Sequence, residues 1–307
     1  MTTETAFIEA LRALATHDAA RGLRDDAAVL EIGGAALVLT SDTIVAGVHF
    51  LPADPPEDIG WKLAAVNLSD LAAKGAQPLA CLMNYALTGD DDWDRRFLLG
   101  LKEALDLYGM PLIGGDTVAM PEGAPGVFTL TAIGKGPDCG VPSRSGAKAG
   151  DILCVTGTVG DAGLGLELAK RGEKSPPNCL RAYRRPQPLV QEGQLLAPLV
   201  HAMMDVSDGV LIDAARMAAA SAVAVEISLD RLPLSQALLS SGQDDLQLRT
   251  AAATAGDDYQ LLLAVPPGTP LPLPVTIIGR FAEGQGVSLL NSGTLVPLPS
   301  RLGYLHG

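Results

Sequence analysis

The chain has 307 residues, of which 48% are hydrophobic and 19% are charged, and its 35 acidic and 22 basic residues leave a formal net charge of -13. This hydrophobic content excludes a disordered chain, and the length predicts two domains that are each large enough to bury a core. The acidic balance argues against a nucleic-acid partner, because a phosphate-binding surface needs clustered Lys and Arg.

Helical and strand-like patterns alternate along the first half of the chain. Apolar spacing typical of amphipathic helices and short β-type runs bounded by turn residues divide it into elements. Gly33-Gly34 separates two of these runs and predicts a hairpin. Helices are predicted over residues 4–17, 59–73 and 93–108, and strands over 27–32, 35–39, 79–87, 110–113 and 127–133.

A segment rich in Gly, Pro and Ser, residues 135–151, predicts a domain boundary, which we place between residues 137 and 138. The sequence therefore predicts an α+β protein with two mixed α/β domains, residues 1–137 and 138–307. No repeat with a period of ~20–50 residues is present, which argues against solenoids and propellers. Beyond the boundary, helices are predicted over 162–171 and after Asp208, and strands over 152–155, 223–229, 260–265 and 275–278.

No stretch approaches the ~18 uncharged apolar residues of a membrane span, and residues 1–9 are acidic where a signal peptide would be basic. We therefore expect a cytoplasmic protein without a membrane partner. The cysteines, Cys81, Cys139, Cys154 and Cys179, lie far apart and include no CxxC pair. They predict buried thiols rather than a zinc site or a disulfide framework.

Aspartate is in excess among the acidic residues, with 24 Asp against 11 Glu. Because Glu is the better helix former, this excess indicates carboxylates in turns and at the ends of elements. Residues 1–137 have a net charge of -10 and residues 138–307 a net charge of -3. The first half is therefore where we expect a cation site.

Six segments place an Asp directly after a small residue or another Asp, usually at the end of an apolar run. Short carboxylates beside small residues suit hard cations, and Mg2+ is commonly shared between carboxylates and substrate phosphates. Six such positions predict more than one ion and a polyphosphate ligand. Helix caps and turns are the alternative explanation for each Asp taken alone. The segments are Asp25-Asp26, Ser41-Asp42, Ser69-Asp70, Gly115-Asp116, Asp205-Val206-Ser207-Asp208 and Gly256-Asp257-Asp258.

The common nucleotide-binding loops are absent, since the sequence has no GxxxxGK[ST] and no GxGxxG in a Rossmann context. We expect a nucleotide to be held through metal ions, hydroxyl groups and a few cations. Arg144 is a candidate phosphate contact, with a solvated linker arginine as the alternative. His49 lies seven residues after Asp42, beside the candidate site. No GxSxG elbow accompanies a serine, so no covalent intermediate is expected.

Seven motifs follow one another in a fixed order: RDDAA from Arg24, TSDT with GVHFLP from Thr40, AVNLSDLAAKGAQP, LIGGDT, SRSGAKAGD, DVSDG and AGDDYQL. Together they resemble the thiamine-monophosphate kinase family, which belongs to the superfamily of aminoimidazole ribonucleotide synthetase. The resemblance runs from about residue 20 to the C-terminus.

The resemblance implies two α+β domains, the first of which pairs with its counterpart in a second subunit to form a β-barrel-like core of a homodimer. ATP would bind in the cleft between the domains, near the dimer interface. The implied reaction transfers the γ-phosphate of ATP to thiamine monophosphate and gives thiamine diphosphate and ADP, with several Mg2+ ions as cofactors.

The resemblance also implies the site residues. Asp42, a bridging metal ligand, and Asp208, which would hold a metal near the transferring phosphate, carry the catalysis. His49, Asp257 and Tyr304 would hold thiamine monophosphate, with Tyr304 able to stack on an aromatic ring. The implied metal ligands are Asp26, Thr40, Ser41, Asp42, Asp70, Asp116, Asp205 and Asp208. The implied nucleotide contacts are Asp26, Gly115, Asp116, Arg144 and Ser207.

Three positions depart from the family's usual pattern. Arg24 replaces the glycine before the Asp pair, and Asp257 replaces a glutamate that is one methylene longer. The chain ends soon after His306 and lacks the Phe that commonly follows it. These departures concern the affinity and pose of the substrate more than the chemistry.

Two alternatives stay open. Another ATP-dependent enzyme of the superfamily is one, although selenophosphate synthetase needs a Cys or selenocysteine near its N-terminus, and the first Cys here is Cys81. The related hydrogenase maturation factor ends in a reactive Cys, and this chain ends in Leu-His-Gly. A non-catalytic metal-binding module is the second alternative, although EF-hand spacing is absent.

Overall fold

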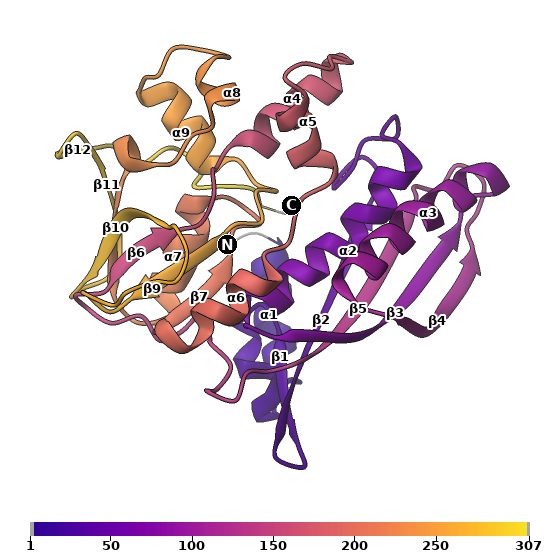
Figure 1. The fold of residues 1–307 in the computed structure, drawn as a ribbon, viewed down its shortest axis with the longest axis horizontal. Coiled ribbons are helices and arrows are strands. Elements are labelled where there is room, and N and C mark those ends of the chain that lie inside the picture. The colour runs from indigo at the N-terminus through magenta and orange to yellow at the C-terminus, as the bar shows by residue number, and fades with distance from the viewer. Residues whose placement is uncertain (1–2, 306–307) are drawn as a thin grey trace.

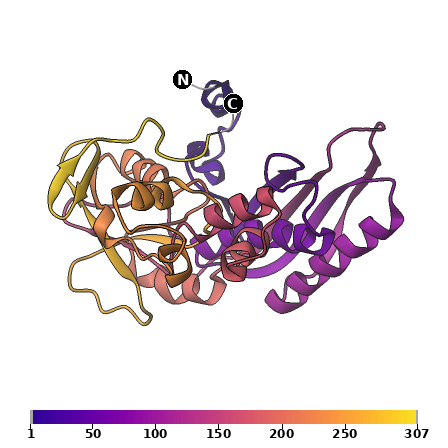
Figure 2. The ribbon, with the colours of Figure 1, turned by 90° about the horizontal axis from the view of Figure 1, so that it is seen from above.

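The protein is described by a computed structural model that covers residues 3–305, with the side chains of residues 3–5 left out. The departure from the family pattern at His306 lies outside the described residues. Two β-sheets, one from each half of the chain, lie on either side of a central helical layer (Figure 1). Helix α1 (Thr3–Arg12) and the short helix η1 (Asp18–Leu23) precede the first sheet, and α1 projects from the rest of the chain (Figure 2).

The first sheet has five strands in the order β1-β2-β5-β3-β4. β1 and β2 form the predicted hairpin around Gly33-Gly34, and β5 pairs antiparallel with both β2 and β3. β4 lies parallel to β3 at the edge of the sheet, because the helix between them returns the chain to the same end. The strands are β1 (Ala28–Ile32), β2 (Ala35–Val45), β3 (Gln77–Leu87), β4 (Leu112–Ala119) and β5 (Val127–Lys135).

Two long helices, α2 (Pro56–Ala73) and α3 (Asp91–Tyr108), cover one face of this sheet (Figure 1). Asp90 caps α3 by accepting hydrogen bonds from the backbone N–H groups of Asp92 and Trp93 at 3.0 and 3.1 Å. α2 is buried along nearly its whole length, because it packs on the first sheet on one side and on the second half of the chain on the other. Its two partners together explain why its sequence is apolar on most faces.

The packing of α2 on α3 depends on glycine. A Cβ atom at Gly100 of α3 would lie 1.7 Å from the backbone oxygen of Glu57 on α2. We therefore expect Gly100→Ala to push the helices apart and to cost about 2–3 kcal/mol of unfolding free energy, which corresponds to a melting temperature ~5–10 °C lower. Calorimetry of this variant checks the expectation. Arg95→Ala, on an exposed part of the same helix, should stay within about 0.5 kcal/mol of the wild type.

The second sheet has seven strands in the order β12-β11-β8-β10-β6-β9-β7. The neighbouring strands β6 and β9 are wholly apolar and almost entirely buried, as expected of strands covered on both faces. The strands are β6 (Ile152–Val155), β7 (Ala202–Asp205), β8 (Ala224–Ser228), β9 (Leu261–Val265), β10 (Thr276–Ala282), β11 (Gly286–Asn291) and β12 (Thr294–Val296). The helices are α4 (Asp161–Arg171), α5 (Pro177–Arg184), α6 (Val190–Leu196), η2 (Ala197–Leu199), α7 (Val210–Ala220), η3 (Leu229–Arg231), α8 (Gln236–Leu239) and α9 (Leu246–Thr254).

Several predicted elements differ from the structure. The helix predicted over 4–17 ends at Arg12, because His17 instead caps η1 by accepting from the N–H of Ala19 at 3.1 Å. The strand predicted over 35–39 continues to Val45, and the strand predicted over 110–113 runs from Leu112 to Ala119. Polar and glycine residues in these two strands hide them from a hydrophobicity pattern. The short helices α5, α6, α8 and α9 and the strands β7, β11 and β12 were not predicted.

Two further expectations are wrong. Asp42 lies within β2, Asp70 within α2 and Asp116 within β4, so the excess of Asp is not confined to turns and element ends. Pairing and packing with the rest of the fold extend these elements past the carboxylates. The second error concerns Cys139, which is exposed in the loop after Lys135, whereas Cys81, Cys154 and Cys179 are buried as predicted. Among residues 3–305, no helix is both long enough and apolar enough to span a membrane.

Candidate active site

A cavity of about 440 Å³ lies between the two halves of the chain. One wall is α2, which presents Lys62, Val66 and Asp70 at four-residue spacing, so that all three share one helix face. β2 adds Asp42, and the second half adds Asp205 at the end of β7 and residues of α4 and of the loop before β9. The two halves therefore build one site.

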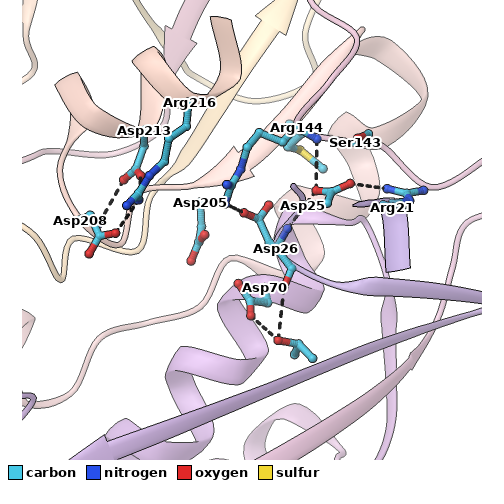
Figure 3. A network of polar contacts seen from close by, with 12 residues as sticks. Arg21, Asp25, Asp26, Asp70, Ser143, Arg144, Asp205, Asp208, Asp213 and Arg216 are labelled. Atoms are coloured by element: carbon cyan, nitrogen blue, oxygen red, sulfur yellow. Dashed lines mark hydrogen bonds and ion pairs between the residues drawn. The ribbon is translucent and has the colours of Figure 1, made fainter. Parts of the chain in front are cut away.

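Three carboxylates at this cavity have no cationic partner. Among the described residues, no Lys or Arg forms an ion pair with Asp42, Asp70 or Asp205. Two of them accept hydrogen bonds from uncharged hydroxyl groups: Thr40 Oγ1 donates to Asp70 Oδ2, and Ser69 Oγ donates to Asp205 Oδ2 at 2.6 Å. Figure 3 shows Asp70 and Asp205 grouped with Asp26. Buried negative charge of this density needs compensation from a bound cation or from protons.

The pKa values of these carboxylates are raised, as expected for acidic groups without a positively charged partner. Burial raises the pKa of Asp42 to about 6, and burial together with the charge of Asp26 raises the pKa of Asp205 to about 8. Burial and the neighbouring carboxylates Asp42 and Asp205 raise the pKa of Asp70 well above its usual range. A hard cation reverses these shifts, because it favours the ionised form. In residues 3–305 no three Asp, Glu, His or Cys side chains converge as ligands of one ion.

These raised pKa values predict that the metal-free protein loses stability as pH rises. Above the usual Asp pKa of 3.8, the native state still holds protons that the unfolded chain has released, so the free energy of unfolding falls until the folded pKa values are passed. We expect melting temperatures in EDTA to fall between about pH 5 and pH 8.5. The corresponding loss of unfolding free energy is on the order of a few kcal/mol. In millimolar Mg2+ the melting temperature should change little over the same pH range. A melting temperature in EDTA that rises across this window would contradict the assignment.

Asp25 and Asp26 differ from this group because cations hold them. Lys74, which is buried, lies 2.5 Å from Asp25 Oδ1 and 2.7 Å from Asp26 Oδ2 through its Nζ. Arg144 comes from the segment between the domains and forms an ion pair with Asp26. Burial by itself would raise the pKa of Asp26, but Lys74 and Arg144 outweigh it and keep that pKa below its usual range. Arg144 is thus fixed at the site and is not a solvated linker residue.

Asp208 lies just before α7 in a second ionic group. Arg216 Nη1 is 2.5 Å from Asp208 Oδ2 and 2.9 Å from Asp213 Oδ1. Asp213 also accepts hydrogen bonds from the backbone N–H groups of Asp208 and Gly209, which fixes the turn into α7. Figure 3 shows this group beside Asp205. Asp208 therefore faces the cavity with one oxygen bound to Arg216, which is an electrostatic competitor for any metal there.

The predicted substrate residues line the same cavity. His49 Nδ1 accepts a hydrogen bond from the N–H of Val45 at 3.1 Å, which orients the ring. The backbone N–H of Tyr304 donates to the carbonyl of Asp208 at 3.0 Å, so the C-terminal segment returns to the site. Asp257 has a positive φ of 67°, a conformation that Asp tolerates better than most residues. Val48 and Leu166 add an apolar wall beside them.

Six predicted residues do not line this cavity. Asp26, Thr40 and Arg144 lie next to it, joined to Asp70 and to one another by hydrogen bonds and an ion pair, whereas Ser41, Gly115 and Asp116 have no such link among the described residues. β2, β5, β3 and β4 align Thr43 with Thr129, Asn84 and Asp116 in register. Asp116 therefore lies three strands from β2, or about 14 Å away at the usual strand spacing. Ser41 lies on the opposite face of β2 from Asp42, where its hydroxyl contacts Thr131 Oγ1 at 2.9 Å. Gly115 adjoins Asp116, with a φ of 149° and Met83 O only 1.8 Å from where a Cβ would be.

Several residues of the site were not predicted from the sequence. Lys62 within α2 and Lys74, the residue that follows α2, continue the four-residue spacing of Val66 and Asp70, and this spacing is a readable signal. Arg216 and Asp213 gave no comparable signal, because an ion pair on a surface helix has the same pattern.

Comparisons with known proteins show which family this chain belongs to. The family described as AIR synthase related protein matches with its N-terminal domain over residues 24–135 and with its C-terminal domain over residues 148–289. A thiamine-monophosphate kinase of Caulobacter vibrioides is 41% identical over 315 residues, which cover 97% of this chain and 88% of the relative. The chain belongs to the thiamine-monophosphate kinase family. Its fold is the two-domain α/β fold of that superfamily.

Two more relatives support the family assignment. The thiamine-monophosphate kinase of Escherichia coli is 36% identical over 94% of this chain and 92% of its own length. A solved structure described as AaThiL complexed with AMPPCP and TMP has a TM-score of 0.87 at 30% identity, covering 98% of this chain and 97% of that one. The similarity thus extends over both halves of the chain and over the cavity between them.

Proposed function

We propose that this protein transfers the γ-phosphate of ATP to thiamine monophosphate and releases thiamine diphosphate and ADP. The observation that carries the proposal is the set of carboxylates without a cationic partner, the buried Asp205 and the half-buried Asp42 and Asp70, at one cavity with His49 and Tyr304. Membership of the thiamine-monophosphate kinase family supports it, as does the related structure that holds AMPPCP and TMP together.

The donor set fits magnesium. Mg2+, when bound, offsets negative charge on the phosphates and aligns the two reacting groups. Aspartate oxygens are the ligands that this ion prefers, and among the described residues no Lys or Arg forms an ion pair with Asp42, Asp70 or Asp205. We propose that the residues holding metal at the cavity are Asp26, Thr40, Asp42, Asp70, Asp205 and Asp208.

The residues at the cavity suit direct in-line transfer. The phosphate of thiamine monophosphate is already ionised near neutral pH, so the reaction needs no strong general base. Two anions must meet, and the protein contributes positioning and charge compensation. Arg144 is suited to the nucleotide phosphates, because its buried Nε has no hydrogen-bond acceptor among the described residues. Ser207, which lines the cavity, is the proposed hydroxyl contact.

The other end of the cavity suits the organic part of the substrate. Thiamine monophosphate combines a cationic thiazolium with an aminopyrimidine ring. Val48 and Leu166 provide apolar contact, and Tyr304 provides an aromatic face. Asp257 and His49 provide the polar contacts. We propose that Asp257, although shorter than the usual Glu, serves the same role.

A homodimer would explain how Gly115 and Asp116, which lie away from the cavity of their own chain, could contribute to an active site. Among the described residues, β4 is exposed along its whole length, and Leu112, Ile113 and Val118 are 44, 62 and 49% exposed. An edge strand with apolar side chains is a surface that a second copy can cover. We propose that the two first sheets pair as a barrel-like core, so that Gly115 and Asp116 of one subunit reach the nucleotide and metal at the other.

Turnover with defined substrates tests the proposed function. We expect ADP release from ATP and Mg2+ to depend on thiamine monophosphate and to be absent with thiamine alone. ATP binding without turnover of either compound would favour another enzyme of the superfamily. A non-catalytic module predicts no heat of ATP binding in calorimetry with Mg2+. The cytoplasmic location stays a prediction.

A further inference from the structure

Lys62 is a buried lysine that the mechanism above does not use. Its side chain is 2% exposed, and it lies on α2 two turns before Asp70, on the face that lines the cavity. An ammonium group buried to this extent is destabilising unless its hydrogen atoms find partners. The contacts of Lys62 therefore indicate what keeps a charge at this position.

The ammonium group of Lys62 has three partners from three parts of the chain. Its Nζ donates to Asp257 Oδ2 at 2.8 Å and to the backbone oxygen of His49 at 3.0 Å. The ring of Tyr183 on α5 lies over it, with the centroid 4.3 Å from Nζ. Tyr183 is in turn fixed by donating its hydroxyl to Asp54 Oδ2 at 2.8 Å. The ammonium group thus joins the loop after β2 to the loop before β9.

Asp257 depends on these contacts for its orientation. Its other carboxylate oxygen, Oδ1, accepts from the hydroxyl of Tyr259 at 3.0 Å, and its backbone N–H donates to Ser207 O at 2.8 Å. Both carboxylate oxygens are therefore held while the side chain remains 27% exposed toward the cavity.

We propose that Lys62 is the positioning residue of the substrate subsite: its ammonium group fixes Asp257 and the His49 loop in the geometry that receives thiamine monophosphate. This inference rests on the proposed function, because it takes Asp257 and His49 as contacts of that substrate. Lys62 does not contact the nucleotide end, where Arg144 and Lys74 are the cations. Loss of Lys62 should therefore weaken the binding of thiamine monophosphate and leave the binding of ATP unchanged.

The experiment compares Lys62→Met with the wild type and with Lys102→Met, a matched control in which an exposed lysine of α3 loses its ion pair with Asp106. We expect Lys62→Met to raise KM for thiamine monophosphate by about tenfold or more and to change KM for ATP by less than about twofold. Lys102→Met should change neither. In the double variant Lys62→Met/Asp257→Asn, KM for thiamine monophosphate should not exceed that of Asp257→Asn alone, because the two residues act as one unit.

Hydrogen–deuterium exchange separates this inference from the proposed function. Faster exchange of residues 256–259 in Lys62→Met, with unchanged exchange of β7, supports the positioning role whichever substrate the enzyme uses. Equal effects on both KM values, additive effects in the double variant, or unchanged exchange at 256–259 would each overturn it. A wild-type enzyme that does not use thiamine monophosphate would refute the proposed function, and the exchange result would still decide whether Lys62 positions Asp257.

Discussion

Asp42→Ala and Asp208→Ala should each lower kcat/KM with thiamine monophosphate by about a thousandfold, which corresponds to ~4 kcal/mol of transition-state stabilisation. Asp42 belongs to the cation-free carboxylates at the cavity, and Asp208 lies at the start of α7 beside them. Without either one, a metal would bind the phosphates less firmly at the moment when negative charge is greatest. Steady-state kinetics at saturating Mg2+ measures the loss.

The same variants should remain folded. Removing Asp42 relieves repulsion that raises the pKa of Asp70, so Asp42→Ala in EDTA should melt no lower than the wild type near pH 8. Asp208→Ala leaves Arg216 with its second partner, Asp213, at 2.9 Å. Asp92→Asn, which removes an exposed carboxylate far from the cavity, is the matched control and should retain wild-type activity. Wild-type turnover by Asp42→Ala or Asp208→Ala would refute the metal assignment.

Mixing two inactive variants should restore activity if Asp116 acts across a dimer interface. Asp42→Ala and Asp116→Ala are each expected to be nearly inactive, because each removes one proposed ligand from both sites of the dimer. In a mixed dimer, one site combines the intact Asp42 of one subunit with the intact Asp116 of the other. Random exchange makes about half of the dimers mixed, so about a quarter of wild-type activity should return.

The geometry of β4 motivates this expectation. Asp116 lies about 14 Å from β2 within one chain, which is too far to share an ion with Asp42. Subunits unfolded together and refolded provide the exchange, and each variant refolded alone is the control. No recovery in a mixture that light scattering shows to be dimeric would mean that Asp116 acts within its own chain or has no role.

The sequence identified most of the acidic cluster but not its partners. Asp42, Asp70, Asp205 and Asp208 were predicted because small residues beside an Asp form a local pattern. Local patterns cannot show a contact such as Lys62 with Asp257, which joins residues 195 positions apart. Local patterns also could not predict the order of the strands. Asp116 is separated from Asp42 because β5 and β3 lie between β2 and β4.

Helix periodicity was the signal that could have extended the prediction. The helix predicted over 59–73 already contained Asp70, and residues four apart on a helix share a face. Lys62 and Val66 follow from Asp70 by that rule, and both line the cavity. Arg144 was identified only as a candidate, because its ion pair with Asp26 spans 118 positions and no local feature distinguishes it from a solvated arginine.

The path of the γ-phosphate distinguishes direct transfer to thiamine monophosphate from hydrolysis of ATP and from phosphorylation of thiamine. The enzyme is incubated with ATP labelled in its γ-phosphate, Mg2+ and an equal mixture of thiamine monophosphate and thiamine, and the products are separated. We predict label in the terminal phosphate of thiamine diphosphate, in equal amount to the ADP formed, with none in thiamine monophosphate. Label released as free phosphate, or label in thiamine monophosphate formed from thiamine, would contradict direct transfer to thiamine monophosphate.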